Sequence, residues 1–420
     1  MPAVAAGRAR EAWRLLRDDG PRRLAQRVSR VAYNRLGAAS LDFPLDFDDV
    51  ADSRELSLAT PATRPAPGTP LTVGWVCVPP GPGSGGHTTM LRMVEAVEAA
   101  GHRCVLYLYD RFRGDLARHE QVIRRHWPGV RAEVRSVEDG LAPLDAYVAS
   151  SWQTAHVLAA RAEVPTRRLY FVQDFEPYFY PQGSEYALAE DTYRFGFRCV
   201  TVGHMLARLL CERYGAIAEV AEFGCDTDVY RLDESGPRDG VVFYARREVA
   251  RRGFELGMLA LIEFHRRQPG RPIHLFGDPG VRAPFPAVNH GRLTPAGLAA
   301  LYNRCRAGIA LSFTNISLVP VEMLACGVVP VLSGHAQQSS DLDNPHLRWA
   351  EPTPARIAEE LEAIVSSSDP PPATVSASVP ASSGWSAATR MVVATIEDEV
   401  YGHGLYTSGT RKNGARSLTA

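Results

Sequence analysis

The segment "RREVARR" (246–252) carries four arginines in seven residues and directly follows the apolar run "VVFYA" (241–245). The apolar run predicts a buried strand, and "GFELGMLALIEFHRR" (253–267) predicts a helix. Arg246 and Arg252 would then lie between a strand end and a helix start. Guanidinium groups and free backbone N–H groups bind phosphate at such places. A solvent-exposed charged turn is the alternative, but the position after a strand favours a site for an anionic diphosphate.

The segment "TNISLVP" (314–320) follows a second apolar run, 307–313, and opens a predicted helix at 318–327. Backbone N–H groups at this helix start could bind the same phosphates. Glu322 lies in this otherwise apolar helix, where a carboxylate needs a partner. Its two acceptor oxygens could take the hydroxyls of a sugar, and a salt bridge to an arginine is the alternative.

Two further loops, "LFGDPG" (275–280) and "HGRLT" (290–294), could offer backbone groups to a nucleobase. All these loops follow strands or precede helices, so they should meet at one edge of a sheet. The predicted nucleotide- and diphosphate-binding residues are Gly85, Gly86, Arg246, Arg252, Gly277, Leu293, Asn315, Ile316, Ser317, Leu318 and Glu322.

The stretch 171–196 interleaves carboxylates with tyrosines after a predicted strand. Aromatic rings stack on sugar faces, and carboxylates accept hydrogen bonds from sugar hydroxyls. The alternative is an aromatic-rich core helix with exposed acids. The predicted acceptor- or sugar-binding residues are His87, Asp174, Glu176, Tyr178, Tyr180 and Tyr186. Asp174 is also predicted to orient the donor sugar or the acceptor, which places it with Arg246 and Arg252 in the predicted catalytic set.

A glycine-rich segment, "GPGSGG" (81–86), spells G-x-G-x-x-G between a predicted strand and a predicted helix. Asp110 ends the next predicted strand. This pattern is typical of NAD sites, so an NAD-dependent oxidoreductase is one hypothesis. Two features argue against an NAD site. Pro82 within the glycines removes a backbone N–H that a phosphate could use, and an NAD site would leave the arginine-rich loop 246–252 without a role. Gly85 and Gly86 could instead let the backbone approach a donor diphosphate or sugar.

The surrounding chain predicts the elements that position these loops. Strands are expected at 71–78, 103–109, 144–149, 167–173, 198–203 and 218–222, and again at 241–245, 272–277, 307–313 and 328–334. Strands that alternate with helices predict parallel sheets covered on both faces. We therefore expect an α/β chain with two Rossmann-like, doubly wound lobes facing a cleft, at 71–235 and 236–370. A basic helical extension and linker (1–70) precede them, a helix at 385–402 returns to the first lobe, and a disordered tail (403–420) follows.

The composition excludes several classes of function. The 420 residues carry a net charge of −1, which argues against nucleic-acid binding. Seven cysteines without a C-x-x-C pair indicate reduced thiols, a cytoplasmic chain and no zinc or other metal site. Residues 1–38 hold nine arginines against three acids, with a partial apolar face. Such a segment can lie peripherally on an anionic membrane, and the alternative is a helix that packs on its own protein.

The spacing of these motifs resembles the nucleotide-binding lobe of the two-lobed (GT-B) glycosyltransferases of family 4. That family shows G-R-x(n)-K-G after a strand, and "YARREVARRG" is similar, with Ala245 for the first Gly and Arg252 for the Lys. The family also shows E-x7-E, of which Glu322 matches the second position and Thr314 replaces the first. With "FVQDFEPYFYPQGSEYALAEDTYRFG" (171–196), the chain looks like bacterial dTDP-rhamnose-dependent rhamnosyltransferases of surface polysaccharide synthesis.

This resemblance implies a transfer of rhamnose from dTDP-rhamnose to a growing, lipid-linked glycan. It also implies retention of the anomeric configuration, no metal and no cofactor besides the donor. Arg246 and Arg252 would stabilise the charge that grows on the leaving diphosphate. A non-catalytic two-lobed sugar-binding protein is the third hypothesis.

Overall fold

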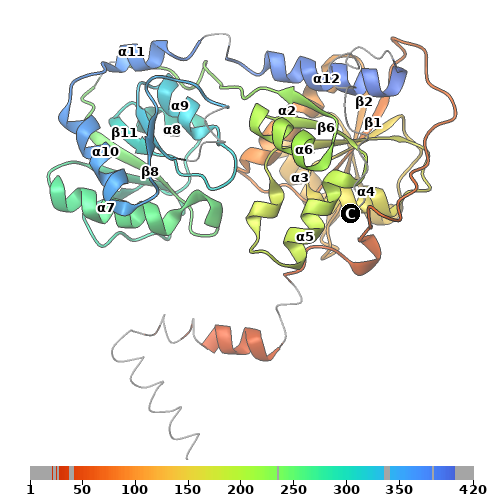
Figure 1. The fold of residues 1–420 in the computed structure, drawn as a ribbon, viewed down its shortest axis with the longest axis horizontal. Coiled ribbons are helices and arrows are strands. Elements are labelled where there is room, and N and C mark those ends of the chain that lie inside the picture. Colours follow the sequence, from red (N-terminus) through yellow and green to blue (C-terminus); the bar gives the residue numbers. More distant parts are fainter. Residues whose placement is uncertain are drawn as a thin grey trace, which may run out of the picture. The chain divides into compact units, whose positions relative to one another are not determined.

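The computed structural model describes residues 21, 25, 28–36, 42–233, 236–334, 341–380 and 383–402 (Figure 1). The chain divides into two compact units, 1–49 and 50–420. In the first unit, residues 28–35 are helical and the side chains of Val28, Val31 and Leu36 are exposed. Most of the basic segment 1–38 and the whole predicted disordered tail, 403–420, lie outside the described residues.

A seven-stranded parallel sheet forms the centre of the first lobe, in the order β3-β2-β1-β4-β5-β6-β7. Its strands are β1 (Thr72–Cys77), β2 (Arg103–Leu108), β3 (Glu133–Ser136), β4 (Ala146–Ala149), β5 (Arg167–Val172), β6 (Arg198–Val202) and β7 (Ala218–Ala221). The strand order reverses between β1 and β4, and open α/β sheets bind ligands beyond the carboxyl ends of their strands at such a point. The glycine-rich loop follows β1 at this edge.

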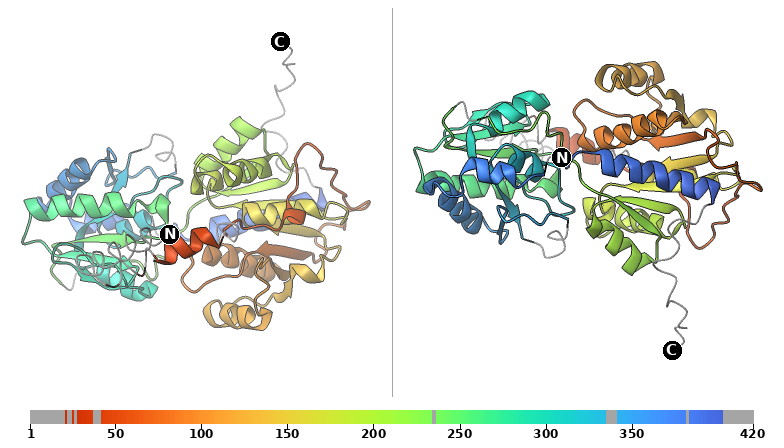
Figure 2. Two further views of the ribbon diagram at one scale, coloured as in Figure 1. Left: turned by 90° about the horizontal axis from the view of Figure 1, so that it is seen from below. Right: turned by 90° about the horizontal axis from the view of Figure 1, so that it is seen from above.

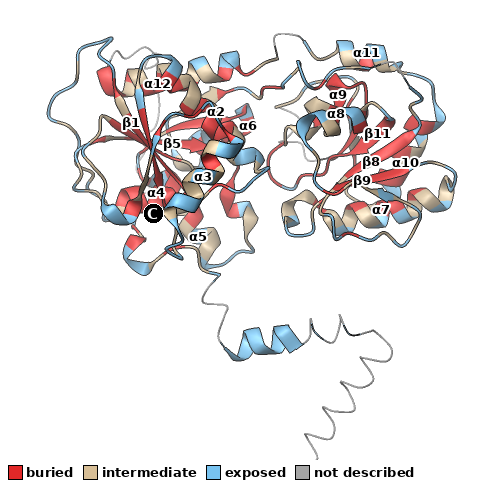
Figure 3. Cartoon of the chain, turned by 180° about the vertical axis from the view of Figure 1, so that it is seen from behind, coloured by how far each residue is buried: buried red, intermediate tan, exposed pale blue. Residues whose placement is uncertain are grey.

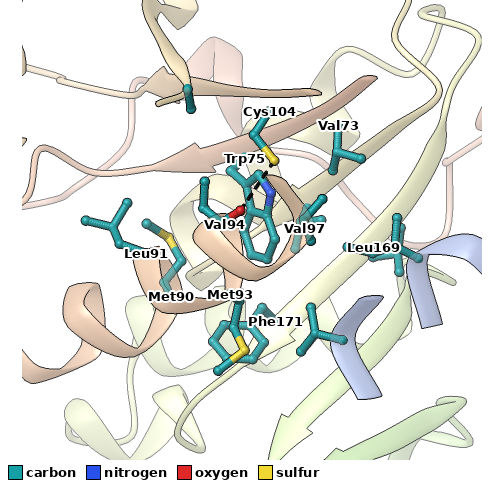
Figure 4. Close-up of a cluster of buried hydrophobic side chains, with 14 of the residues drawn as sticks. Val73, Trp75, Met90, Leu91, Met93, Val94, Val97, Cys104, Leu169 and Phe171 are labelled. Atoms are coloured by element: carbon teal, nitrogen blue, oxygen red, sulfur yellow. Dashed lines mark hydrogen bonds between the residues drawn. The ribbon is translucent and has the colours of Figure 1, made fainter. Parts of the chain in front are cut away.

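Helices cover both faces of this sheet: α2 (Gly85–Ala99), α3 (Leu116–His126), α4 (Trp152–Ala160), α5 (Ser184–Asp191) and α6 (His204–Tyr214). Figure 4 shows the core between α2 and the sheet, where Trp75 lies among Val94, Cys104 and Phe171. The rings of Trp75 and Phe171 meet edge to face, with centroids 6.3 Å apart. Because β1 is buried on both faces, its sequence is a continuous apolar run rather than an alternating one.

A six-stranded parallel sheet forms the second lobe, in the order β10-β9-β8-β11-β12-β13. Its strands are β8 (Gly240–Ala245), β9 (Ile273–Gly277), β10 (Val288–Asn289), β11 (Cys305–Ile309), β12 (Val329–Ser333) and β13 (Arg348–Ala350). Its helices are α7 (Phe254–Arg267), α8 (Pro295–Tyr302), α9 (Val319–Ala325), α10 (Pro354–Ser366) and α11 (Pro372–Ala377). Figure 3 shows the strands of both sheets as the buried centres of their lobes.

The late helix α12 (Ser386–Tyr401) packs on the first lobe, where it contacts α2 and β7 (Figure 2, right). Ala388, Val392 and Ile396 belong to the buried core of that lobe. Arg198 of β6 donates to Asp398 at 2.6 Å, which fixes the helix against the sheet. The chain therefore passes from the first lobe to the second and back again.

The α/β architecture with two Rossmann-like lobes is confirmed, since both sheets are parallel and both are covered by helices. The sequence patterns missed β3, β10 and β13, which are two to four residues long and partly exposed. The segment 51–70, interpreted as linker, is fastened to the first lobe. There the Ala51 amide donates to His156 Nδ1 at 3.1 Å, and the Ser53 hydroxyl donates to Asp191 at 2.7 Å.

Candidate functional site

Asp174 lies just beyond the carboxyl end of β5 and reaches the second lobe. Its carboxylate accepts hydrogen bonds from the Thr314 hydroxyl at 2.9 Å and from the Asn315 amide at 3.2 Å. The backbone amide of Phe175 also donates to it, at 2.9 Å. Burial raises the pKa of Asp174, while the guanidinium groups of Arg251 and Arg252 and the bond from Thr314 oppose the rise. Asp174 therefore joins the two lobes through its own side chain.

The arginine-rich loop of the second lobe approaches the same carboxylate. Arg251 Nε lies 3.3 Å from Asp174 Oδ2, and the Arg251 guanidinium stacks 4.2 Å from the centroid of the Phe179 ring. The neighbouring Arg252 donates from Nη1 to the Ser312 hydroxyl at 2.9 Å. Burial lowers the pKa of Arg252 to about 10, so its guanidinium remains charged at neutral pH. Two cations and one carboxylate thus meet where the lobes touch.

A glycine brings this loop close to the adjoining strand end. Gly253 has a φ of +60°, and a Cβ built there would lie 2.9 Å from the ring of Phe313 and 3.1 Å from Leu311. Both the left-handed backbone and the close contact require glycine at this position. Helix α7 begins at the next residue, so Arg252 lies at a helix N-terminus, as the sequence pattern predicts.

The remaining arginines of the loop point to other partners. Arg246 is half-buried and donates to the Tyr244 hydroxyl at 3.2 Å. It lies beside Gly277 at the end of β9, where a Cβ would come 3.1 Å from Arg246 Cγ. Arg247 is exposed and forms an ion pair with Asp278 at 2.8 Å. Arg246 and Gly277 are therefore neighbours, whereas Arg247 belongs to the surface.

The loop 312–318 connects the second lobe to the first. The side-chain amide of Asn315 donates to the Gln173 carbonyl, and Leu318 packs on the hydrophobic core of the first lobe. Ile316 is buried and Ser317 is half-buried. The first hydrogen bond within α9 runs from the Glu322 amide to the Leu318 carbonyl, so the amides before Glu322 have no acceptor inside this helix.

Glu322 lies one turn into α9 and is half-buried. Burial raises its pKa to about 7, the charge of Asp226 adds to the rise, and a hydrogen bond from the Tyr230 hydroxyl opposes it. No ion pair with an arginine is recorded for this carboxylate in the described part of the chain, so the salt-bridge alternative has no support there. Leu293 packs on the same apolar cluster as α8 and α9.

The glycine-rich loop reaches the lobe junction through the start of α2. Gly85 and Gly86 are exposed, and a Cβ on Gly86 would lie 3.6 Å from the side chain of Gln173. The side chain of His87 forms hydrogen bonds with two other residues of the same loop region. Its Nε2 lies 3.1 Å from the Val78 carbonyl, which can only accept, so the Ser84 hydroxyl must donate to Nδ1 at 2.8 Å. The His87 ring is therefore engaged in holding the loop.

Asp110, the residue that an NAD site would direct at a ribose, is also engaged. Its carboxylate accepts from the amides of Phe112 and Gly114 at 3.0 and 2.9 Å. His119 Nε2 lies 2.9 Å from the same carboxylate. These three contacts make Asp110 the organiser of its own turn, and they weaken the NAD interpretation.

The aromatic stretch 171–196 separates into a buried part and an exposed part. Glu176 is 5% exposed and accepts hydrogen bonds from the Trp152 amide at 2.5 Å and the Tyr170 hydroxyl at 3.3 Å. Its carboxyl group is thus engaged at the start of α4. The Tyr180 hydroxyl accepts from the Trp152 indole at 3.1 Å. These contacts favour the core alternative for Glu176. They also indicate that Tyr180 supports the side chain of Trp152.

The other two tyrosines of the predicted sugar-binding set lie nearer the surface. Tyr178 is 39% exposed and its ring meets Phe175 edge to face at 4.6 Å. Tyr186 on α5 is half-buried. Both keep part of a ring face accessible, and their role in sugar binding stays a prediction.

Glu176→Gln is expected to flatten the pH dependence of stability. Burial raises the pKa of Glu176 from 4.5 to about 8. Between those values the folded chain holds a proton that the unfolded chain has released, so the free energy of unfolding should fall as the pH rises from about 5 to 8. Glutamine keeps an acceptor for Trp152 and removes this slope. Urea unfolding across that range checks it, with Glu185→Gln on α5 as the control. Equal slopes in the wild type and Glu176→Gln would refute the assignment.

The structure adds partners that were not among the predicted site residues: Gln173, Arg251 and Thr314. Arg251 could have been found, because it belongs to the same arginine cluster. Thr314 and Gln173 are ordinary residues in ordinary loops, and only the contact between the lobes gives them a role. In the described ranges, no group of three His, Cys, Asp or Glu side chains is placed to hold a metal ion. None of the helices described there has the length and apolar character needed to cross a membrane.

Comparison with known families matches a part of each lobe. Residues 136–204 match the family described as the N-terminal domain of WsaF, and residues 239–362 match the family described as its C-terminal domain. The O-antigen biosynthesis protein RfbC of Myxococcus xanthus is 31% identical over 342 residues. That match covers 75% of this chain but 26% of RfbC, so the chain spans about a quarter of its curated relative.

Solved structures share the fold at low identity. The Anabaena protein HepE, in complex with UDP and glucose, superposes with a TM-score of 0.55 at 14% identity, over 79% of this chain and 98% of that one. A glycosyltransferase from Rickettsia africae gives a TM-score of 0.55 at 11% identity, over 79% and 99%. These likenesses show that the two Rossmann-like lobes form the GT-B fold.

Proposed function

We propose that this protein is a glycosyltransferase of polysaccharide biosynthesis that takes a sugar from a nucleoside diphosphate donor. The observation that carries the proposal is the position of Arg252. Its charged, largely desolvated guanidinium lies at the start of α7, where the lobes meet, and Ser312 is the one acceptor recorded for it among the described residues. A guanidinium has five N–H donors, so several are available to an anion.

The proposed reaction places the donor diphosphate against the second lobe. Arg252 and Arg246, with amides of the loop 316–318, would hold the phosphates and stabilise the negative charge that develops as the bond to the sugar breaks. Fixed guanidinium groups can supply this charge without a metal ion. Asp174 would keep Arg251 and Arg252 in place through its contacts with both lobes. In this scheme the leaving phosphate assists attack from the same face, with retention.

In this proposal the donor is dTDP-rhamnose, and the enzyme belongs to glycosyltransferase family 4. This assignment is supported by the resemblance of the stretches 171–196 and 246–253 to rhamnosyltransferases, and by the similarity to a protein named for O-antigen biosynthesis. Gly277 and Leu293 would lie near the base, and Gly85 and Gly86 near the sugar. Tyr178 is exposed and Tyr186 is half-buried, so both could offer part of a ring to an acceptor sugar.

The acceptor in this proposal is a growing glycan on a lipid carrier, at the cytoplasmic face of a membrane. The basic composition of residues 1–38 and the exposed apolar side chains on its described helix support peripheral binding to an anionic surface. Nucleic acid and a separate cofactor have no place in the scheme.

Glu322→Gln is expected to weaken binding of a nucleoside diphosphate about fivefold at pH 8, as for the loss of one hydrogen bond of about 1 kcal/mol. The pKa of about 7 means that the wild-type carboxylate loses its proton as the pH passes through 7. Its affinity for dTDP should therefore rise more between about pH 6 and pH 8 than the affinity of the variant, for which the terminal phosphate of dTDP, with a pKa of about 6, still titrates. Calorimetric titration at both pH values checks this. Equal affinity and equal pH dependence in both proteins would assign Glu322 a structural role.

A donor screen tests the proposed activity. Purified protein is incubated with a panel of dTDP-, UDP- and GDP-sugars, and both the melting temperature and the release of nucleoside diphosphate are measured. We expect dTDP-rhamnose to raise the melting temperature most and to be hydrolysed slowly in the absence of acceptor. Preference for another donor would correct the sugar, and no response to any nucleotide sugar would refute the activity.

A further inference from the structure

The N-terminus of α6 in the first lobe is capped by a side chain of the second lobe. The residue before the helix is Gly203, which has no side chain to serve as a cap. Asp341 Oδ1 accepts a hydrogen bond from the Met205 amide at 2.7 Å. An aspartate is among the preferred caps, because its carboxylate satisfies helix-start amides that have no partner in the helix. Here the cap comes from a part of the chain more than a hundred residues away.

The first lobe is shaped to admit this carboxylate. Gly203 has a φ of +97°, and a Cβ built there would lie 2.8 Å from Asp341 Oδ2 and 2.7 Å from the ring of Phe223. Any side chain at this position would collide with the incoming aspartate. Burial raises the pKa of Asp341, and the amides of His204 and Met205 oppose the rise. The glycine and the aspartate from the two lobes therefore fit as a pair.

A second contact runs in the opposite direction. Asp174 of the first lobe accepts from Thr314 and Asn315 of the second, so each lobe offers one carboxylate to the other. The chain itself crosses between the lobes twice, and the two crossings are joined by a bond from the Cys225 amide to the Ser383 carbonyl at 2.7 Å. The crossings can serve as a hinge, and the two carboxylates are the contacts that an opening motion would have to break.

We propose that Asp341 is a positioning residue that, together with Asp174, forms a reciprocal clasp holding the two lobes closed. Loss of one helix cap shifts an equilibrium by roughly fivefold, so the clasp is strong enough to favour the closed arrangement and weak enough to release. Asp341 comes after β12 in the sequence, and the carboxyl end of β12 lies next to that of β11, which leads into the loop of Thr314 and Asn315. Closing the clasp therefore assembles residues of both lobes at one place.

Interlobe distance measurements test the clasp on the full chain. Cys211 on α6 is exposed and the six other cysteines are buried, so a spin label will attach to it selectively. A second label is placed by Leu259→Cys on α7, where the native side chain is 51% exposed. In this background, Asp341→Ala is expected to raise the ratio of long to short label distances about fivefold. Thr314→Val, which weakens the other contact without touching α6, should shift the ratio in the same direction.

Asp343→Asn, an exposed acid two residues away, is the matched control and should leave the distances unchanged. Circular dichroism shows whether each variant is folded. Longer distances in Asp341→Ala and Thr314→Val, but not in the control, support the clasp. Unchanged distances in folded Asp341→Ala would overturn it, and so would an equal shift in Asp343→Asn. No substrate is present, so this result is independent of the proposed reaction.

Discussion

Arg252→Ala is expected to abolish sugar transfer and to weaken nucleoside diphosphate binding by about 1.5–3 kcal/mol, the range for hydrogen bonds to a charged group. The guanidinium lies at the N-terminus of α7 and remains charged although burial lowers its pKa to about 10. In a desolvated place, one fixed positive charge contributes more to binding an anion than it would in water. Calorimetric titration with dTDP measures the binding loss, and product release measures the transfer.

Arg247→Ala is the matched control for this prediction. It removes an arginine from the same loop, but one that is exposed and paired with Asp278. We expect dTDP affinity to change no more than about fivefold, since an exposed charge contributes between 0 and about 1 kcal/mol. Equal losses in both variants would mean that the loop acts only through its total charge. Full binding and turnover in Arg252→Ala would remove Arg252 from the diphosphate site.

Asp174→Ala is expected to lower the free energy of unfolding by about 3–5 kcal/mol, as for the removal of one partner from a buried ion pair. The change leaves Arg251 without its carboxylate and removes the acceptor of Thr314 and Asn315. Urea unfolding, followed by the fluorescence of the native tryptophans, measures the loss. Transfer should be lost as well, because Arg252 would no longer be held beside a counter-charge.

Two comparisons make the Asp174 result specific. Asp174→Asn keeps an oxygen acceptor and should cost less stability than alanine. Asp226→Ala removes an acid that also pairs with an arginine, Arg92, but in an exposed place, and should cost about 1 kcal/mol or less. A loss in Asp174→Ala no larger than that in Asp226→Ala would show that the carboxylate does not join the lobes.

The apolar runs predicted the core strands well because those strands are buried on both faces. β1, β2 and β5 begin and end within one or two residues of their expected bounds. The short edge strand β13 was missed because its residues are partly exposed and only pairing with β12 makes it a strand. An apolar sequence pattern indicates that a segment is buried, and an edge strand is only partly buried.

The candidate site was predictable in its residue types and less so in its contacts. The arginine cluster after β8 and the acid in α9 could be found, because charge beside apolar runs is costly without a purpose. Asp174 and Glu176 look equivalent in sequence, two residues apart after the same strand. Only the fold shows that Asp174 contacts the second lobe, whereas Glu176 turns inward to the start of α4. Asp341 had no local signal, because the helix start that it caps lies far away in the chain.

Binding of dTDP and of NAD to the wild-type chain, measured by calorimetry side by side, tests the proposed nucleotide site most directly. We expect dTDP to bind with one site per chain, with an affinity that falls at least tenfold in Arg252→Ala, and NAD to show no binding. Binding of NAD without binding of dTDP, or dTDP binding that is indifferent to Arg252, would contradict the proposal that the second lobe holds a sugar donor by its diphosphate.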